Sequence, residues 1–236
     1  MWQLTINSDK CQVLHLGRSN LGFNYGFSYL PLPSPRLVTD LGLRMDVSLS
    51  FSSHIAAIVS KARARCGVFF KSFISRDPST MLKFYVSYIR PILEYCSVVW
   101  SPTAIGDIKN IERVQRYFSN KIPGCTYLPY RERLAKLSIG SLQHRRSISD
   151  LLYLYSIVSG SNSTILSPHL IHIPPSVTRG HNLKLVLPNI KYAATNQNFL
   201  SRTIPIWNNL PITVLDATSK ANFKKKLSVF LVDPYC

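Results

Sequence analysis

The chain begins with apolar and polar residues in alternation and changes to helical spacing near Phe51. An alternating run from Trp2 to Ile6 is followed by the polar stretch 7–10 and by a second apolar run that stops at Gly17. These runs predict two strands joined by a tight turn, because alternation buries one face of a strand and Asn, Ser and Asp favour turns. Residues 36–46 predict a third short strand.

From Phe51 onward, apolar residues recur every three or four positions, which is typical of amphipathic helices. Asp77 and Pro78 suit the cap and the first position of a second helix. Pro91 lies within that helix and is expected to kink or break it, because proline lacks an N–H and clashes with the preceding turn. The predicted helices span residues 51–73, 77–99, 107–122, 130–137 and 141–158.

The last part of the chain is less regular. Residues 159–176 are rich in Ser, Asn and Pro and predict a linker. Two short strand-like pieces, 184–188 and 198–207, precede a final helix over 219–231. The whole pattern predicts an α+β fold that is mainly α, with a small antiparallel strand region, a helical bundle and a small mixed C-terminal segment. The expected boundaries are 1–48, 49–158, 159–176 and 177–236.

The composition adds a strong positive charge. Lys and Arg number 28 against 11 Asp and Glu, which gives a formal net charge of +17. Such a chain is expected to bind polyanions, and RNA or DNA is favoured over an anionic membrane. The most apolar long stretch, 84–100, contains Arg90 and Glu94 and does not predict a membrane span. A basic scaffold that needs RNA only to stay in solution is the alternative explanation.

The five cysteines are scattered without any C-x-x-C pair, which predicts neither a disulfide framework nor a zinc site. Cys66 and Cys96 are expected to be small core residues. The sequence starts without a basic and apolar leader, so an intracellular location, cytoplasmic or nuclear, is expected. The helical spacing of Tyr88, Tyr95 and Trp100 favours core packing over base stacking.

Clusters of basic residues are the candidates for contact with nucleic-acid phosphates. They are Lys61, Arg65, Lys109, Arg113, Arg116, Arg145 and Arg146. The first five fall on the outer faces of two predicted helices, where they would follow a phosphate backbone. Most Lys and Arg residues of the chain have no acidic neighbour to pair with, which favours phosphate contact. A solvated helix face without any ligand is the alternative.

Several stretches, in order, resemble reverse transcriptases of non-LTR retrotransposons of the jockey and CR1 type. Residues 2–17 resemble the motif D block after the active-site strand, with its Asn-x-x-Lys, and residues 36–55 resemble motif E, the primer-grip strand with its Leu-Gly. The run Y-x-R-P-x-L-E-Y-x-x-x-V-W-S-P over 88–102 and the helix with IERVQR match the thumb and the region C-terminal to it. The resemblance covers nearly the whole chain.

This resemblance implies the edge of a polymerase palm, then a helical thumb, from a truncated RNA-directed DNA polymerase that is inactive alone. In the family, the two metal-binding aspartates precede the point that matches residue 1. Lys10 matches the motif D lysine, which would stabilise the pyrophosphate leaving group, although a solvated turn lysine is the alternative. Leu41 and Gly42 match the primer grip, for which a simple strand with a glycine bulge is the alternative.

Metal chemistry is not expected from these residues. Nucleotidyl transfer needs carboxylates close enough to hold two divalent ions, and the chain has no Asp-Asp or Asp-x-Asp. We therefore expect no catalytic residue, no metal ligand and no cofactor, although the family uses Mg²⁺. The expected partners are RNA, DNA or an RNA/DNA hybrid, and the missing palm and fingers. The alternative is a non-enzymatic basic interaction module, or a pseudogene-derived protein without retained activity.

Overall fold

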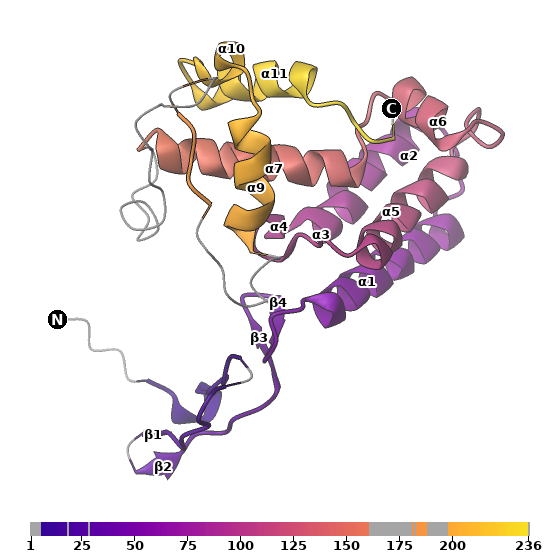
Figure 1. Ribbon diagram of the computed structural model, residues 1–236. Coiled ribbons are helices and arrows are strands. Elements are labelled where there is room, and N and C mark those ends of the chain that lie inside the picture. Colours follow the sequence, from indigo (N-terminus) through magenta and orange to yellow (C-terminus); the bar gives the residue numbers. More distant parts are fainter. Residues whose placement is uncertain are drawn as a thin grey trace. The chain divides into compact units, whose positions relative to one another are not determined.

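The computed structural model describes residues 6–17, 19–27, 29–160, 181, 183–187 and 198–235. It confirms an α+β fold that is mainly α, with two small antiparallel strand pairs and many helices (Figure 1). The chain divides into two compact units, residues 1–57 and 58–236. The predicted strand over 2–6, apart from Ile6, and nearly all of the predicted linker lie outside the described residues.

The N-terminal unit contains two hairpins. Strands β1 (Gly26–Phe27) and β2 (Leu30–Pro31) form the first, and β3 (Leu37–Asp40) and β4 (Leu43–Asp46) form the second. The prediction of one strand over 36–46 is therefore wrong. Leu41 and Gly42 form the two-residue turn, with φ values of 47° and 83°, and positive φ at both positions is the geometry that two-residue hairpin loops favour.

A second strand before Gly17 is also a wrong prediction. Residues 8–10 form a short 3₁₀ helix, η1 (Ser8–Lys10), because Asn7 caps it by accepting a hydrogen bond from the Asp9 N–H at 2.9 Å. Residues 11–16 belong to no strand in the described part of the chain. This unit exposes many large apolar side chains: Ile6, Leu16, Leu21, Phe23, Tyr25, Leu30, Leu37 and Leu41.

Helix α1 (Ser52–Ser72) follows the predicted spacing closely. Val59, Ala62, Cys66 and Phe69 recur at helical intervals, and all four are buried. Phe69 stacks on Phe84, with the ring centroids 4.2 Å apart. The apolar stripe thus becomes the core face, as the sequence predicts.

The next helical stretch contains Pro91 without ending at it. Helix α2 (Pro78–Phe84), capped by Asp77, continues through the π-helical segment η2 (Tyr85–Ile89) into α3 (Arg90–Glu94). The Arg90 N–H donates to the Tyr85 carbonyl, five residues back, and this wider turn makes room for the proline ring beside the preceding turn. The expected break lies later, at Tyr95 and Cys96.

Cys96 has a φ of 56° and is exposed, so the prediction that it is a core residue is wrong. This left-handed residue separates α3 from α4 (Ser97–Trp100) and turns the chain. Trp100 is buried as predicted, and its Nε1–H donates to the Tyr95 carbonyl at 2.7 Å. Tyr88 and Tyr95 are each 57% exposed, so the prediction of core packing fails for them.

Three further helices begin close to where the spacing predicts. They are α5 (Ile105–Asn120), α6 (Tyr130–Leu137) and α7 (Leu142–Val158). Ser141 caps α7, since its hydroxyl accepts a hydrogen bond from the His144 N–H at 3.1 Å.

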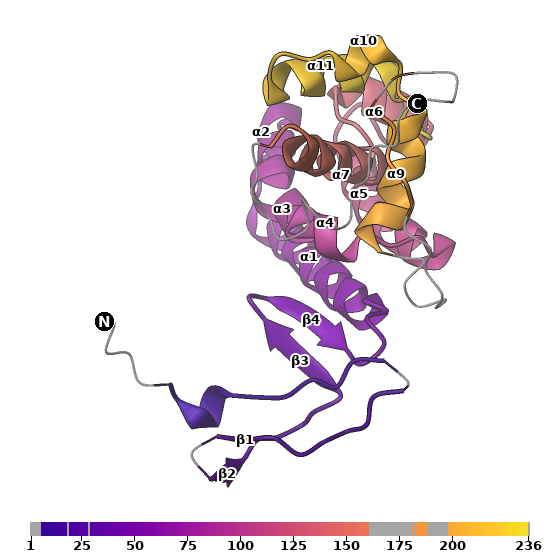
Figure 2. The same ribbon diagram turned by 60° about the vertical axis from the view of Figure 1, so that its left-hand side comes forward.

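The C-terminal helices pack against α7 (Figures 1 and 2). They are α9 (Phe199–Asn208), α10 (Ile212–Leu215) and α11 (Lys220–Phe230). Buried Leu151 and Leu154 of α7 share a core with Ile204, Trp207 and Phe223. Trp207 is fully buried, and its Nε1–H donates to the Leu183 carbonyl at 2.8 Å.

Two predicted strands of this region are wrong. Residues 199–207 lie in α9, whose first turn is capped by the Asn198 side chain. A short apolar run fits either a strand or a helix, and here the cap and the packing on α7 favour the helix. Residues 184–187 form no strand, but the Leu185 N–H donates to Asn208 Oδ1 at 2.8 Å and the Asn208 amide donates to the Leu185 carbonyl at 2.9 Å.

Substitution of Leu41 tests the turn between β3 and β4. Leucine is unfavourable at positive φ, whereas asparagine tolerates it. Leu41→Asn should therefore stabilise the hairpin by about 0.5–1 kcal/mol, measured as slower amide hydrogen exchange over residues 37–46. Gly42→Ala is the opposing control and should accelerate this exchange. Faster exchange in Leu41→Asn would contradict the turn geometry.

Candidate nucleic-acid interface

A strip of three basic side chains runs along the outside of α5. Lys109, Arg113 and Arg116 are all exposed, and at about 100° per residue they lie within roughly 60° of one another around the helix. We call these three residues the α5 strip. None of them forms an ion pair in the described part of the chain, where ion pairs involve Arg90, Arg145 and Arg202. The strip therefore presents uncompensated charge to solvent.

Aromatic rings hold one end of the α5 strip. The Arg116 guanidinium lies 4.5 Å from the ring centroid of Tyr130 and 5.0 Å from that of Tyr235. These rings contact each other edge to face, with centroids 5.7 Å apart. Such cation–π contacts restrict the guanidinium and leave its charge in place. Arg113, in the middle of the strip, donates from Nη1 to Asn110 Oδ1 at 3.1 Å.

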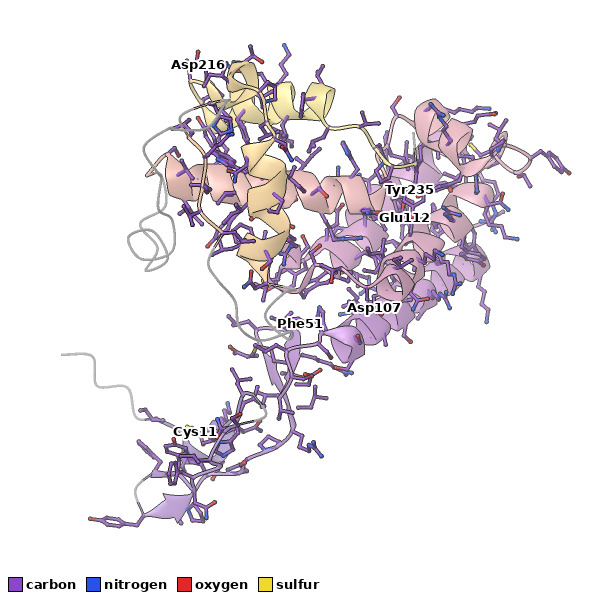
Figure 3. All side chains as sticks on the ribbon, in the orientation of Figure 1. Cys11, Phe51, Asp107, Glu112, Asp216 and Tyr235 are labelled. Atoms are coloured by element: carbon purple, nitrogen blue, oxygen red, sulfur yellow. The ribbon has the colours of Figure 1, made fainter. Side chains whose placement is uncertain are left out.

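Behind the strip, α5 carries a buried polar pair, Glu112 and Gln115, each 1% exposed. Glu112 accepts hydrogen bonds from the Tyr130 hydroxyl and from the N–H groups of Leu142 at 3.2 Å and Gln143 at 3.3 Å. These two N–H groups belong to the first turn of α7, where backbone N–H groups have no acceptor within the helix. Glu112 thus connects α5 to α6 and α7, close to Tyr235 (Figure 3).

Gln115 extends the same network. Its Oε1 accepts from the Tyr85 hydroxyl at 2.7 Å, and its Nε2 donates to the Tyr130 hydroxyl at 3.0 Å and to the Gly140 carbonyl at 3.1 Å. Burial raises the pKa of Glu112, although hydrogen bonds from Tyr130, Leu142 and Gln143 oppose this shift. Burial and the Glu112 carboxylate together raise the pKa of Tyr130, so the hydroxyl stays protonated as a donor.

The sequence analysis missed this network, although one signal was present. Glu112 and Gln115 are three residues apart among the inward-facing residues Ile111, Val114 and Phe118. Polar residues at core positions of an amphipathic helix are expected to have buried partners. Arg133 of α6 was missed as well. It is buried and donates from Nη1 to the Arg116 carbonyl at 2.9 Å, at the last turn of α5.

Lys61 and Arg65 lie on another side of the bundle. Phe70 of α1 contacts Tyr117 of α5, with ring centroids 5.9 Å apart. Arg65 and Lys61 lie roughly 140° and 180° around α1 from Phe70, whereas Arg63 lies within about 20° of it. The structure therefore does not join this pair to the α5 strip, and exposed Arg63 is a basic residue on the same side of α1 as Phe70.

The remaining predicted residues are dispersed. Arg145 forms a two-pronged ion pair with Glu94, in which the Nη2–Oε2 distance is 3.0 Å, and Arg146 is only 2% exposed. Lys10 is exposed at the end of η1, and Leu41 and Gly42 form the β3–β4 turn. The roles assigned to these residues stay predictions.

The described residues contain no group of three or more His, Cys, Asp or Glu side chains that could hold a metal ion. Among them, no helix combines the length and the apolar character needed to cross a membrane.

Removal of the Tyr130 hydroxyl tests the network that supports the strip. Tyr130→Phe keeps the ring beside Arg116 but removes a donor to Glu112 and an acceptor for Gln115, so we expect a loss of about 1–3 kcal/mol in unfolding free energy. Chemical denaturation measures this loss. Tyr127→Phe is the matched control, because Tyr127 is 98% exposed and its change should stay within about 0.5 kcal/mol. Equal stability of the two variants would contradict the network.

Comparison with known proteins gives two partial similarities. Over 126 residues, 52% of this chain and 64% of the relative, the chain is 29% identical to the uncharacterized protein B0403.1 of Caenorhabditis elegans. Over 131 residues, 53% of this chain and 14% of the relative, it is 28% identical to the probable RNA-directed DNA polymerase from transposon X-element of Drosophila melanogaster. The chain thus covers less than two thirds of either relative.

No protein-family profile and no solved structure matches the chain. The similarity to the fly polymerase supports an origin related to transposon reverse transcriptases.

Proposed function

We propose that this chain is a thumb-like, nucleic-acid-binding part of a non-LTR retrotransposon reverse transcriptase, and that the α5 strip contacts the phosphate backbone. The observation that carries the proposal is the strip itself: Lys109, Arg113 and Arg116 are exposed on one side of α5 and have no carboxylate partner in the described residues. Exposed cations without a carboxylate partner bind the phosphates of a nucleic acid and release the counterions condensed on it.

Two further observations support a nucleic-acid ligand. The formal net charge of +17 makes polyanions the expected partners. A protein that is similar to this chain over part of its length is named a probable RNA-directed DNA polymerase. Contacts to phosphate carry little sequence information, so RNA, DNA and hybrid duplexes are all expected ligands. Within that family, we assign the chain to the jockey and CR1 type, with motifs D and E before the bundle.

The proposal gives these residues contacts to nucleic acid and no catalysis of their own. The chain has no adjacent pair of aspartates, and nucleotidyl transfer needs carboxylates that hold two metal ions together. The purified 236 residues should therefore extend no primer in a magnesium-containing extension assay. Incorporation of a single nucleotide would contradict this part of the proposal.

Charge removal on the α5 strip tests the interface. We expect wild-type affinity for an RNA/DNA hybrid duplex to fall about a thousandfold between 50 and 200 mM salt, if roughly six phosphates are engaged. Lys109→Gln with Arg113→Gln should weaken binding and reduce the slope of log affinity against log salt by about two. Fluorescence anisotropy with a labelled duplex measures both quantities.

A matched double variant separates the strip from net charge. Lys224→Gln with Lys225→Gln removes the same charge from exposed positions of α11 and should leave the salt slope close to that of wild type. Lys61→Gln with Arg65→Gln tests the α1 pair in the same way. Equal losses in all three double variants would show that only net charge matters. Unchanged binding in the α5 variant would show that the α5 strip is only a solvated helix face.

A further inference from the structure

A cavity of about 200 Å³ lies among α7, α9 and the loop that leads from α4 to α5. Its polar lining includes Thr103, Gln143, Arg146, Ser147, Asp150 and Arg202. Two guanidinium groups, one carboxylate, an amide and several hydroxyl groups therefore surround one space. None of these residues belongs to the α5 strip.

One residue that lines the cavity is a buried cation with a hydrogen-bond donor that has no acceptor. Arg146 is 2% exposed, and its Nη1 has no hydrogen-bond partner among the described residues. Burial lowers the pKa of Arg146, although nearby carboxylates oppose this shift. A buried guanidinium N–H without an acceptor is unfavourable and is rare in folded proteins.

The carboxylates near Arg146 already have other partners. Asp150 accepts from Arg202 Nε at 2.7 Å and from Arg202 Nη2 at 3.2 Å. Glu94 pairs with Arg145, and Glu112 accepts from Tyr130 and from two N–H groups of α7. Arg146, which lines the cavity together with Arg202, therefore keeps an Nη1 donor without an acceptor among the described residues.

We infer that this cavity binds a phosphate group, with Arg146 Nη1 donating to one of the phosphate oxygens. Arginine suits this role, because its planar fork of donors matches the oxygens of a phosphate. The Gln143 amide and the hydroxyls of Thr103 and Ser147, in the same lining, offer further donors. Such a phosphate would come either from inorganic phosphate or from the phosphodiester of a nucleic acid.

Thermal unfolding of the full chain tests the site. Sodium phosphate at pH 7 should raise the melting temperature in a saturable way, whereas sodium chloride at the same ionic strength should not. Arg146→Gln should weaken phosphate binding about tenfold or more, because a charge-assisted hydrogen bond is lost. The dinucleotide TpT, tested in parallel, separates the two sources: stabilisation by TpT indicates a phosphodiester, and stabilisation by inorganic phosphate alone indicates the free ion.

A second variant keeps the test decisive if Arg146→Gln does not fold. Thr103 is exposed, so Thr103→Glu should fold while its carboxylate opposes an anion in the cavity, and phosphate stabilisation should disappear. Lys225→Gln on α11 is the control that should retain it. A wild-type response no larger than that to chloride, which is the result for a cavity that holds only water, would overturn the site. Undiminished phosphate binding in Thr103→Glu would overturn the proposed site as well. Loss of phosphate stabilisation in the double variant Lys109→Gln with Arg113→Gln would also overturn it, because the phosphate would then bind to α5.

Discussion

The buried carboxylate of Glu112 holds together the part of the chain that carries the candidate interface. The first N–H groups of a helix have no acceptor within that helix. At the start of α7 these groups are shielded from solvent, so they need acceptors from other parts of the protein. Glu112 of α5 accepts two of them and the Tyr130 hydroxyl of α6. A charged group in this position is tolerated only with such partners, because burial opposes its ionised form. The orientation of α5 is thereby fixed relative to α6 and α7.

The C-terminal helices depend on the same arrangement, since α9 and α11 pack on the other end of α7 around Leu151, Leu154 and Trp207. The chain then returns to the start of α7, where Asp233 accepts the Ser141 N–H at 2.7 Å. Two residues later, Tyr235 contacts both Tyr130 and Arg116. The last residues described therefore help to position a cation of the α5 strip, although they are more than a hundred residues away along the sequence.

The helical bundle was predictable because apolar residues recur every three or four positions in α1, α5, α6 and α7, where one face of each helix is buried. The errors occur where local pattern is ambiguous. The apolar run 198–207 fits a strand or a helix, and Leu41 with Gly42 lacks the Asn-Gly or Asp-Gly signature of a two-residue turn. Long-range pairing is not visible in the sequence at all. Glu112 meets the N–H of Leu142, 30 residues away, so its place among inward-facing residues does not reveal which partners it has.

Net charge also says little about a binding surface until the charges are located. Among the described residues, Glu112, Asp150 and Asp233 are buried carboxylates, and Arg133 and Arg146 are buried guanidinium groups. Burial thus removes at least as much negative as positive charge from the surface, and it preserves the positive excess that the composition indicates. Because counterion release requires exposed cations, the α5 strip can contribute to binding, whereas Arg146 can act only on a ligand that enters the cavity beside it.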